Sequence, residues 1–270
     1  MTLDVSKEPV LMGVVNVTPD SFSDGGQFLD AQKAIDHGLM LVEQGAHILD
    51  IGGESTRPGA EPVSPAEEQD RILPVIEGLK SSGALLSADT RHTETMRVAI
   101  EAGVGMINDV NALRAEGAVE AVANSDVLVC LMHMQNNPQT MQKKPNYDDV
   151  IEEISNFLQE RMDVCKRAGI DRKRIVLDPG IGFGKSLKHN VDILKNINQF
   201  SDLGVSILLG TSRKSFIEKI DKGAKEDQRI GGSLASVLYA YSQGVRIFRV
   251  HDVFETRQAL AVFQAISEAN

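Results

Sequence analysis

Residues 47–89 read HILDIGGESTRPGAEPVSPAEEQDRILPVIEGLKSSGALLSAD and contain one complete repeat of the pattern that decides the fold. Apolar runs at His47–Ile51 and Ala84–Ala88 predict two buried strands. Between them, Ser64–Leu79 predicts a helix. It opens with a serine that can cap the first turn, then a proline, and two residues later a glutamate that fits a capping box. A strand, a helix and a second strand predict a parallel β–α–β unit.

The same alternation continues along the rest of the chain. Further apolar runs predict strands at Val10–Val17, Met106–Val110, Val127–Met134, Ile175–Leu177, Ser206–Leu209 and Ile247–Val250. Helical spacing predicts helices at Ala31–Gln44, Thr93–Ala102, Glu116–Ala123, Asp148–Arg167, Leu187–Phe200, Ile230–Ser242 and Phe254–Ile266. The strand runs are apolar throughout, as expected of parallel strands that are covered on both faces.

About eight strand–helix units in 270 residues predict the α/β class and a parallel eight-stranded barrel with outer helices. We therefore expect a (β/α)8 TIM barrel that forms a single domain over residues 1–270. The alternative is an open, doubly wound sheet, which usually needs fewer units.

The composition limits the classes of function. The chain has 28 Lys and Arg against 38 Asp and Glu, a net charge of −10, which argues against binding nucleic acid through its phosphates. A few local cations would still permit an anionic small-molecule substrate. No apolar run approaches the roughly 18 residues of a membrane span, and residues 1–9 lack the apolar core of a secretory signal. Two cysteines exclude a disulfide scaffold. We expect a cytoplasmic enzyme that acts on small molecules.

Polar side chains gather at the carboxyl ends of the predicted strands. They include Asn16, Asp50, Asp89, Asn108, Asp109, His133, Asp178, Arg213, Lys214, Arg249 and His251. Because the strand ends of a barrel converge on one face, we expect a site there. Carboxylates and amides suit a flat heterocycle with N–H donors and a carbonyl, and arginine suits a phosphate or pyrophosphate. Two alternatives stay open: Asp50 and Asp178 could merely cap their loops, and Arg249 could pair with Asp252 or Glu255.

Three other patterns do not indicate a site. Gly184-Lys185-Ser186 lacks the glycine that a phosphate-binding loop needs five residues before Gly184. Met132-His133-Met134 has no second ligand near it in the sequence, which favours packing over metal binding. Cys130 lies inside an apolar strand and is expected in the core.

Seven motifs, in this order along the chain, resemble those of the dihydropteroate synthase family. They are Gly13–Gly26 (GVVNVTPDSFSDGG), Leu49–Gly59 (LDIGGESTRPG), Ser87–Thr90 (SADT), Ile107–Val110 (INDV), Asp178–Lys185 (DPGIGFGK), Gly210–Ser215 (GTSRKS) and Arg249–Asp252 (RVHD). The resemblance extends over nearly the whole chain and is highly specific. It implies a TIM barrel that joins 6-hydroxymethyl-7,8-dihydropterin pyrophosphate to p-aminobenzoate and releases pyrophosphate.

The resemblance also implies roles for individual residues. For the pterin it implies Asp89, Asn108, Met132, Asp178, Phe183 and Lys214. For p-aminobenzoate it implies Phe22, Thr56, Arg57, Pro58 and Ser212. For the pyrophosphate it implies Asn16, Arg57, Arg249 and His251, with Asn16 as a ligand of a Mg²⁺ cofactor. The catalytic residues would be Asp89, Asp178, Lys214, Arg249 and His251, which would support a dissociative substitution. The resemblance further implies a homodimer and a target of sulfonamides.

Two other functions stay open on the sequence alone. A pterin-dependent methyltransferase would share the pterin-binding acids but would have no use for Arg249, His251 or the Arg57–Pro58 loop. A catalytically silent pterin-binding paralogue would retain the pocket, although every motif is intact here.

Overall fold

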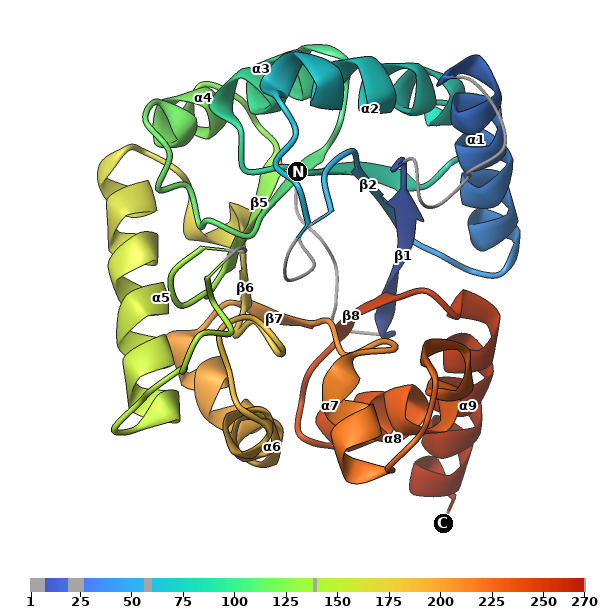
Figure 1. The fold of residues 1–270 in the computed structure, drawn as a ribbon, viewed down its shortest axis with the longest axis vertical. Helices are drawn as coiled ribbons and strands as arrows, with labels where there is room; N and C mark the ends of the chain where they lie inside the picture. Colours follow the sequence, from blue (N-terminus) through green and yellow to red (C-terminus); the bar gives the residue numbers. More distant parts are fainter. Residues whose placement is uncertain (1–7, 19–26, 56–59, 138–139, 270) are drawn as a thin grey trace.

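The computed structural model describes residues 8–18, 27–55, 60–137 and 140–269, and it shows a closed barrel of eight parallel strands (Figure 1). The strands are β1 (Val10–Asn16), β2 (Ile48–Gly52), β3 (Leu85–Asp89), β4 (Met106–Asp109), β5 (Leu128–Met132), β6 (Ile175–Asp178), β7 (Ser206–Leu209) and β8 (Ile247–Val250). Each strand pairs with its neighbour in the sequence, and β8 closes on β1. The predicted TIM barrel is confirmed, and the open sheet is excluded.

Helices surround the barrel on the outside (Figure 1). They are α1 (Gln27–Glu43), α2 (Pro65–Leu79), α3 (Thr93–Glu101), α4 (Ala118–Ala123), α5 (Val150–Arg167), α6 (Leu187–Lys195), α7 (Ser215–Ile220), α8 (Ile230–Ser242) and α9 (Val253–Glu268). The sequence did not predict α7, and the helix predicted at Leu187–Phe200 breaks at Asn196 into α6 and a 3₁₀ helix, Ile197–Leu203. Within the described residues, no helix is long and apolar enough to cross a membrane.

The start of α2 shows how local sequence sets a helix boundary. Ser64 Oγ accepts a hydrogen bond from the Glu67 N–H at 3.2 Å, and proline occupies the first helical position. The Glu67 carboxylate pairs with Arg71 at 2.5 Å, one turn further on. The predicted serine cap is confirmed, and it satisfies one of the N–H groups that a helix start leaves without an internal partner.

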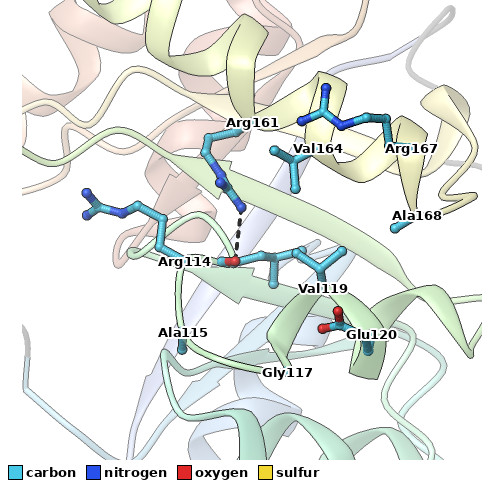
Figure 2. A pocket seen from close by; sticks show the side chains of 10 residues that line it. Arg114, Ala115, Gly117, Val119, Glu120, Arg161, Val164, Arg167 and Ala168 are labelled. Atoms are coloured by element: carbon cyan, nitrogen blue, oxygen red, sulfur yellow. Dashed lines mark hydrogen bonds between the residues drawn. The ribbon is translucent and has the colours of Figure 1, made fainter.

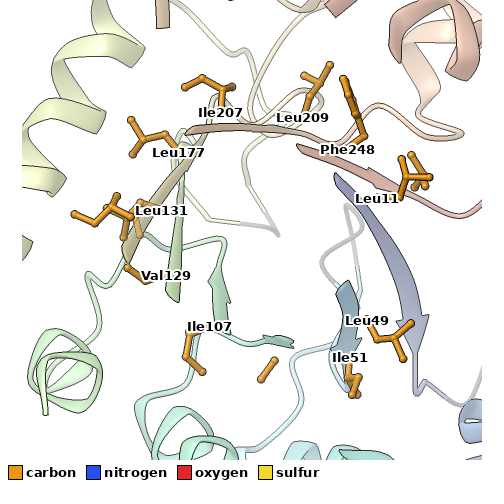
Figure 3. Close-up of a cluster of buried hydrophobic side chains, with 14 of the residues drawn as sticks. Leu11, Leu49, Ile51, Ile107, Val129, Leu131, Leu177, Ile207, Leu209 and Phe248 are labelled. Carbon is orange, nitrogen blue, oxygen red and sulfur yellow. The ribbon is translucent and has the colours of Figure 1, made fainter. Parts of the chain in front are cut away.

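The outer faces of the strands form the larger core, which packs against the helices. Figure 3 shows side chains pointing outward from the barrel wall, among them Leu11, Leu49, Ile51, Ile107, Val129, Leu131, Leu177, Ile207, Leu209 and Phe248. Burial of apolar surface, at about 25 cal/mol per Å², is the main force that holds the helices on the barrel.

The inner faces of the strands carry an apolar layer with polar groups above it. The layer consists of Val10, Met12, Ile48, Met106, Leu128, Cys130, Val176, Leu208 and Ile247. The next inward position, two residues later, is polar on four of these strands: Asp50, Asn108, Asp178 and Arg249. Because side chains alternate between the two faces of a strand, these four lie inside the barrel at its carboxyl-terminal mouth. The core position predicted for Cys130 is confirmed.

Candidate active site

Strand register brings three predicted site residues to the same level of the barrel mouth. Asn16 pairs with Gly52, Gly52 with Asp89, and Asp89 with Asn108. Asp89 and Asn108, both of which the resemblance implies for the pterin, are therefore neighbours on adjacent strands.

Arg249 lies between two carboxylates. Its Nε donates a hydrogen bond to Asp50 Oδ2 at 2.6 Å, and its Nη2 donates to Asp89 Oδ2 at 2.7 Å. The alternative partners considered for Arg249 are wrong, because Asp252 pairs with Arg213 instead, at 2.5 and 3.0 Å. One guanidinium thus serves two acids at the mouth.

Asp50 is completely buried and holds the network together. Its Oδ1 accepts from Ser87 Oγ at 2.6 Å, and its Oδ2 accepts from Asn108 Nδ2 at 2.9 Å as well as from Arg249. A buried carboxylate is stable only when it is paired and hydrogen-bonded. Asp50 therefore fixes the positions of Asn108 and Arg249, which goes beyond the loop-capping role considered for it from the sequence.

Burial, only partly offset by the shared guanidinium, gives Asp89 a pKa near physiological pH. Burial raises the pKa of Asp89 to about 7; Arg249 opposes the rise, and the negative charge of Asp50 adds to it. Burial disfavours the charged form of Arg249, but the two carboxylates raise its pKa above the usual value. The arginine is a permanent cation, while Asp89 changes its charge near physiological pH.

Asp178 and Lys214 lie on the other side of the mouth. Asp178 Oδ1 accepts from the Gly180 N–H at 2.7 Å, so one oxygen caps its own loop. Burial raises the pKa of Asp178, and Lys214 opposes the rise. Burial lowers the pKa of Lys214 to about 8, so the ammonium form still predominates at pH 7. Lys214 Nζ donates to the Ile181 carbonyl and lies 4.7 Å from the centroid of the Phe183 ring.

An apolar wall continues from Phe183. Its ring packs against Val110, Met132, Met134 and Met141. Methionine side chains adapt to the shape of a flat ligand. The predicted packing role of Met132 and Met134 is confirmed, and Met132 pairs in register with Asp178 at the mouth.

Ser212 and His251 form a pair that the sequence did not predict. The backbone N–H of His251 donates to Ser212 Oγ at 3.2 Å, and the same Oγ lies 3.0 Å from the ring nitrogen Nδ1 of His251. Since the hydroxyl oxygen already accepts from the backbone, its hydrogen can go to Nδ1, which favours the tautomer with a hydrogen on Nε2. A residue implied for p-aminobenzoate therefore orients one implied for pyrophosphate.

Comparisons with known proteins establish the family of the chain. The family model described as "Pterin binding enzyme" matches residues 12–251. The chain is 44% identical to the dihydropteroate synthase of Escherichia coli K12 over 270 residues, which covers 99% of this chain and 95% of that protein. This chain belongs to the dihydropteroate synthase family.

Two solved dihydropteroate synthases have the same fold along the whole chain. The Xanthomonas albilineans enzyme with 4-aminobenzoic acid has a TM-score of 0.92 and 48% identity, covering 98% of this chain and 95% of that chain. The Yersinia pestis enzyme in a sulfonamide drug complex has a TM-score of 0.93 and 43% identity, covering 100% and 98%. The enzyme class, a transferase, follows from this membership.

Four of the residues that the dihydropteroate synthase resemblance implies are not placed. Phe22, Thr56, Arg57 and Pro58 lie outside the described residues. Asn16 ends β1 at the mouth, and its amide oxygen is a suitable ligand for Mg²⁺, which is commonly bound through one or two protein oxygens plus substrate phosphates and water. No cluster of three or more His, Cys, Asp or Glu that could hold a metal occurs in the described ranges.

A hollow lies on the outside of the barrel, between α4 and α5 (Figure 2). It has a volume of about 560 Å³ and is lined by Leu113, Arg114, Ala115, Gly117, Val119, Glu120, Arg161, Val164, Arg167 and Ala168. None of the predicted site residues lines it. The convergent acids, the amide and the guanidinium are all at the barrel mouth, which makes the mouth, and not this hollow, the candidate active site.

Two residues of the site were not assigned a role from the sequence. Asp50 was noted as an acceptor only; its inward position, two residues after Ile48, is the signal that places it in the network. Lys185 does not belong to a phosphate-binding loop, yet its side chain is buried between the loops after β5 and β6. It ends the Asp178–Lys185 motif, but that motif alone does not predict the burial of its side chain.

The raised pKa of Asp89 predicts a pH-dependent stability. A carboxyl group whose pKa is higher in the folded state binds more protons when folded, so its protonation stabilises the fold. This contribution to the free energy of unfolding is complete below about pH 4 and is lost as the pH rises to about 7. Asp89→Asn removes the titrating carboxyl group and with it this pH dependence. Urea unfolding across that range should show wild-type stability declining relative to Asp89→Asn as the pH rises. Asp163→Asn, at an exposed aspartate, is the control. If the free energy of unfolding of Asp89→Asn depended on pH as that of the wild type does, Asp89 would not have a raised pKa.

Proposed function

We propose that the barrel mouth joins 6-hydroxymethyl-7,8-dihydropterin pyrophosphate to p-aminobenzoate by a dissociative substitution. The observation that carries the proposal is the buried network of Asp50, Asp89, Asn108 and Arg249, which joins groups for a heterocycle to a cation for a phosphate. Family membership and the solved relative with 4-aminobenzoic acid support the same substrates.

The pterin edge matches the acids and the amide at the mouth. An amino-pyrimidinone edge offers several N–H donors and one carbonyl, so it needs acceptors and at least one donor. Asp89 and Asp178 supply carboxylate oxygens, and Asn108 is held in one orientation by its bond to Asp50. Phe183 and Met132 form the apolar wall, and the Lys214 ammonium supplies a donor beside it.

We assign the leaving pyrophosphate to Arg249, His251 and Asn16, with Arg57, which follows β2 in the sequence. Two nitrogens of Arg249 are bonded to Asp50 and Asp89, while its Nη1 has no hydrogen-bond partner in the described ranges. That nitrogen can bind a phosphate oxygen while the carboxylates hold the rest of the guanidinium in place. Asn16 would hold Mg²⁺, which when bound neutralises charge on the pyrophosphate.

In the proposed mechanism the carbon–oxygen bond to pyrophosphate breaks first. The positive charge that then spreads into the pterin is stabilised by the carboxylates of Asp89 and Asp178, and Arg249 and His251 stabilise the leaving group. The amine of p-aminobenzoate attacks the methylene carbon and loses one proton. Phe22, Thr56, Arg57 and Pro58, with Ser212, would form the p-aminobenzoate pocket. No covalent enzyme intermediate is required.

Pyrophosphate release by the purified protein tests this function. With the pterin pyrophosphate and Mg²⁺ present, release should depend on p-aminobenzoate, and dihydropteroate should form. Asp89→Ala should lower kcat by about 10²- to 10³-fold, the effect typical of losing one electrostatic contact to the transition state, while far-ultraviolet circular dichroism stays that of a folded barrel.

Near-wild-type kinetics in Asp89→Ala would remove Asp89 from the mechanism. Pterin binding without turnover in the wild type would reject the synthase and favour the methyltransferase or the silent paralogue. The exposed Asp163→Asn serves again as the control for a lost carboxylate away from the mouth.

We also propose that the protein forms a homodimer through α7, α8 and α9. Large apolar side chains are exposed on this part of the surface: Ile220, Tyr239, Phe254, Val262 and Ile266. Light scattering should give twice the 29.3 kDa chain mass, and Val262→Glu with Ile266→Glu should give the single-chain mass. Leu39→Glu on α1, an equally drastic change at another exposed site, should leave the dimer intact; a monomeric wild type would contradict the proposal.

We place the enzyme in the cytoplasm. Both cysteines, Cys130 and Cys165, are buried free thiols, which is usual for a protein of a reducing compartment. Cell fractionation is the direct test.

A further inference from the structure

Side chains hold the backbone of the loop between β6 and α6. Four successive carbonyl oxygens each accept a hydrogen bond from a different side chain. The donors are Lys214 to Ile181, Gln142 to Gly182 (2.5 Å), Lys185 to Phe183 (2.9 Å) and Tyr147 to Gly184 (2.9 Å). A glycine-rich loop is intrinsically free to change shape, so this many bonds to its backbone fix a shape that the glycines alone would not.

Two glycines let this loop lie directly on the residues that follow β5. Gly180 has φ +71°, and a Cβ there would lie 1.9 Å from the His133 carbonyl oxygen. Gly184 has φ +64°, and a Cβ there would lie 2.9 Å from the Gln135 carbonyl oxygen. The loops after β5 and β6 therefore make one continuous wall of the mouth.

Lys185 occupies the seam between these two loops and is only 1% exposed. Its Nζ lies 2.9 Å from the Phe183 carbonyl, 3.0 Å from His133 Nδ1 and 3.4 Å from the His133 carbonyl. All three acceptors are uncharged, so no ion pair compensates the burial. Burial lowers the pKa of Lys185 well below its ordinary value, and the charge of Asp178 opposes that effect.

Burying an amine between two loops costs free energy unless its hydrogens make hydrogen bonds. A methionine would fill similar space without that cost, so packing alone does not explain a lysine here. What the amine adds is a set of hydrogen bonds across the seam, from the β5 side at His133 to the β6 side at Phe183.

Phe183 is the residue whose backbone Lys185 holds, and its ring lines the mouth. The ring lies 4.7 Å from Lys214 Nζ and packs against Met132. A small rotation of the loop would move the ring and the Ile181 carbonyl that Lys214 binds. The geometry of the slot therefore depends on the seam behind it.

We propose that Lys185, with Tyr147 beside it, is a positioning residue for the pterin slot, holding the β6–α6 loop against the end of β5 so that Phe183 and Lys214 are preset for the ligand. The proposal rests on the proposed function, because it takes the slot to bind a pterin. A purely structural lysine would instead affect only stability, and the folded protein would bind the pterin normally.

Lys185→Met in the full chain tests the proposal, because it keeps the apolar bulk and removes the donor. We expect the Kd for 6-hydroxymethylpterin, measured by fluorescence titration, to rise about tenfold, and the KM for the pterin pyrophosphate to rise with it. The KM for p-aminobenzoate at saturating pterin pyrophosphate should stay at the wild-type value. Lys188→Met, three residues away with an 82% exposed side chain, is the matched control and should bind as the wild type does.

Wild-type pterin affinity in folded Lys185→Met would overturn the proposal, even if the melting temperature fell. Should Lys185→Met not fold, Tyr147→Phe decides, since it removes a single oxygen that bonds the Gly184 carbonyl. Weaker pterin binding in Tyr147→Phe supports the positioning role, and unchanged binding overturns it. If the wild-type protein does not bind the pterin, the proposed function itself is wrong, and the titration of the wild type shows this before any variant is measured.

Discussion

The site depends on one guanidinium that is shared by two buried carboxylates. Arg249 holds Asp50 at 2.6 Å and Asp89 at 2.7 Å, and Asp50 in turn orients Asn108. Removing any member would leave a buried charge or polar group without its partner, which is strongly unfavourable. Burial raises the pKa of Asp89, and Arg249, which also serves Asp50, opposes the rise only in part, so Asp89 can respond to a ligand that brings N–H donors or positive charge.

The barrel supplies what this network needs. Alternation along the strands places an apolar layer inside the barrel and puts the next inward side chains, such as Asp50 and Arg249, on top of it. The layer excludes water from below, so the charges interact in a medium of low polarity. On the opposite side of the mouth, side chains donate hydrogen bonds to the carbonyls of the loop after β6 and hold the wall at Phe183 in place.

Much of this could be predicted from the sequence. The strands at Ser206–Leu209 and Ile247–Val250 have the predicted bounds, because apolar runs bounded by turn residues are unambiguous in a β/α repeat. The convergence of Asp89, Asn108 and Arg249 followed from the barrel rule alone. Their pairing did not, because which carboxylate an arginine reaches depends on register and side-chain direction. The Asp178–Lys185 motif contains Lys185, but its burial could not be predicted, since burial between two loops leaves no periodic signal. The short α7 was missed because six residues are too few to show helical spacing.

The acidity of Asp89 is the most direct test of the shared guanidinium. The pH dependence of kcat/KM for the pterin pyrophosphate should be measured for the wild type and for Asp50→Asn. In the wild type, activity should fall on the acid side near pH 7, as Asp89 takes up a proton. Asp50→Asn removes the neighbouring negative charge and lowers the pKa of Asp89. The acidic limb of the pH profile, where activity falls, should therefore move to lower pH. A limb that stays at the wild-type pH would show that Asp50 and Asp89 do not share Arg249 as the structure indicates.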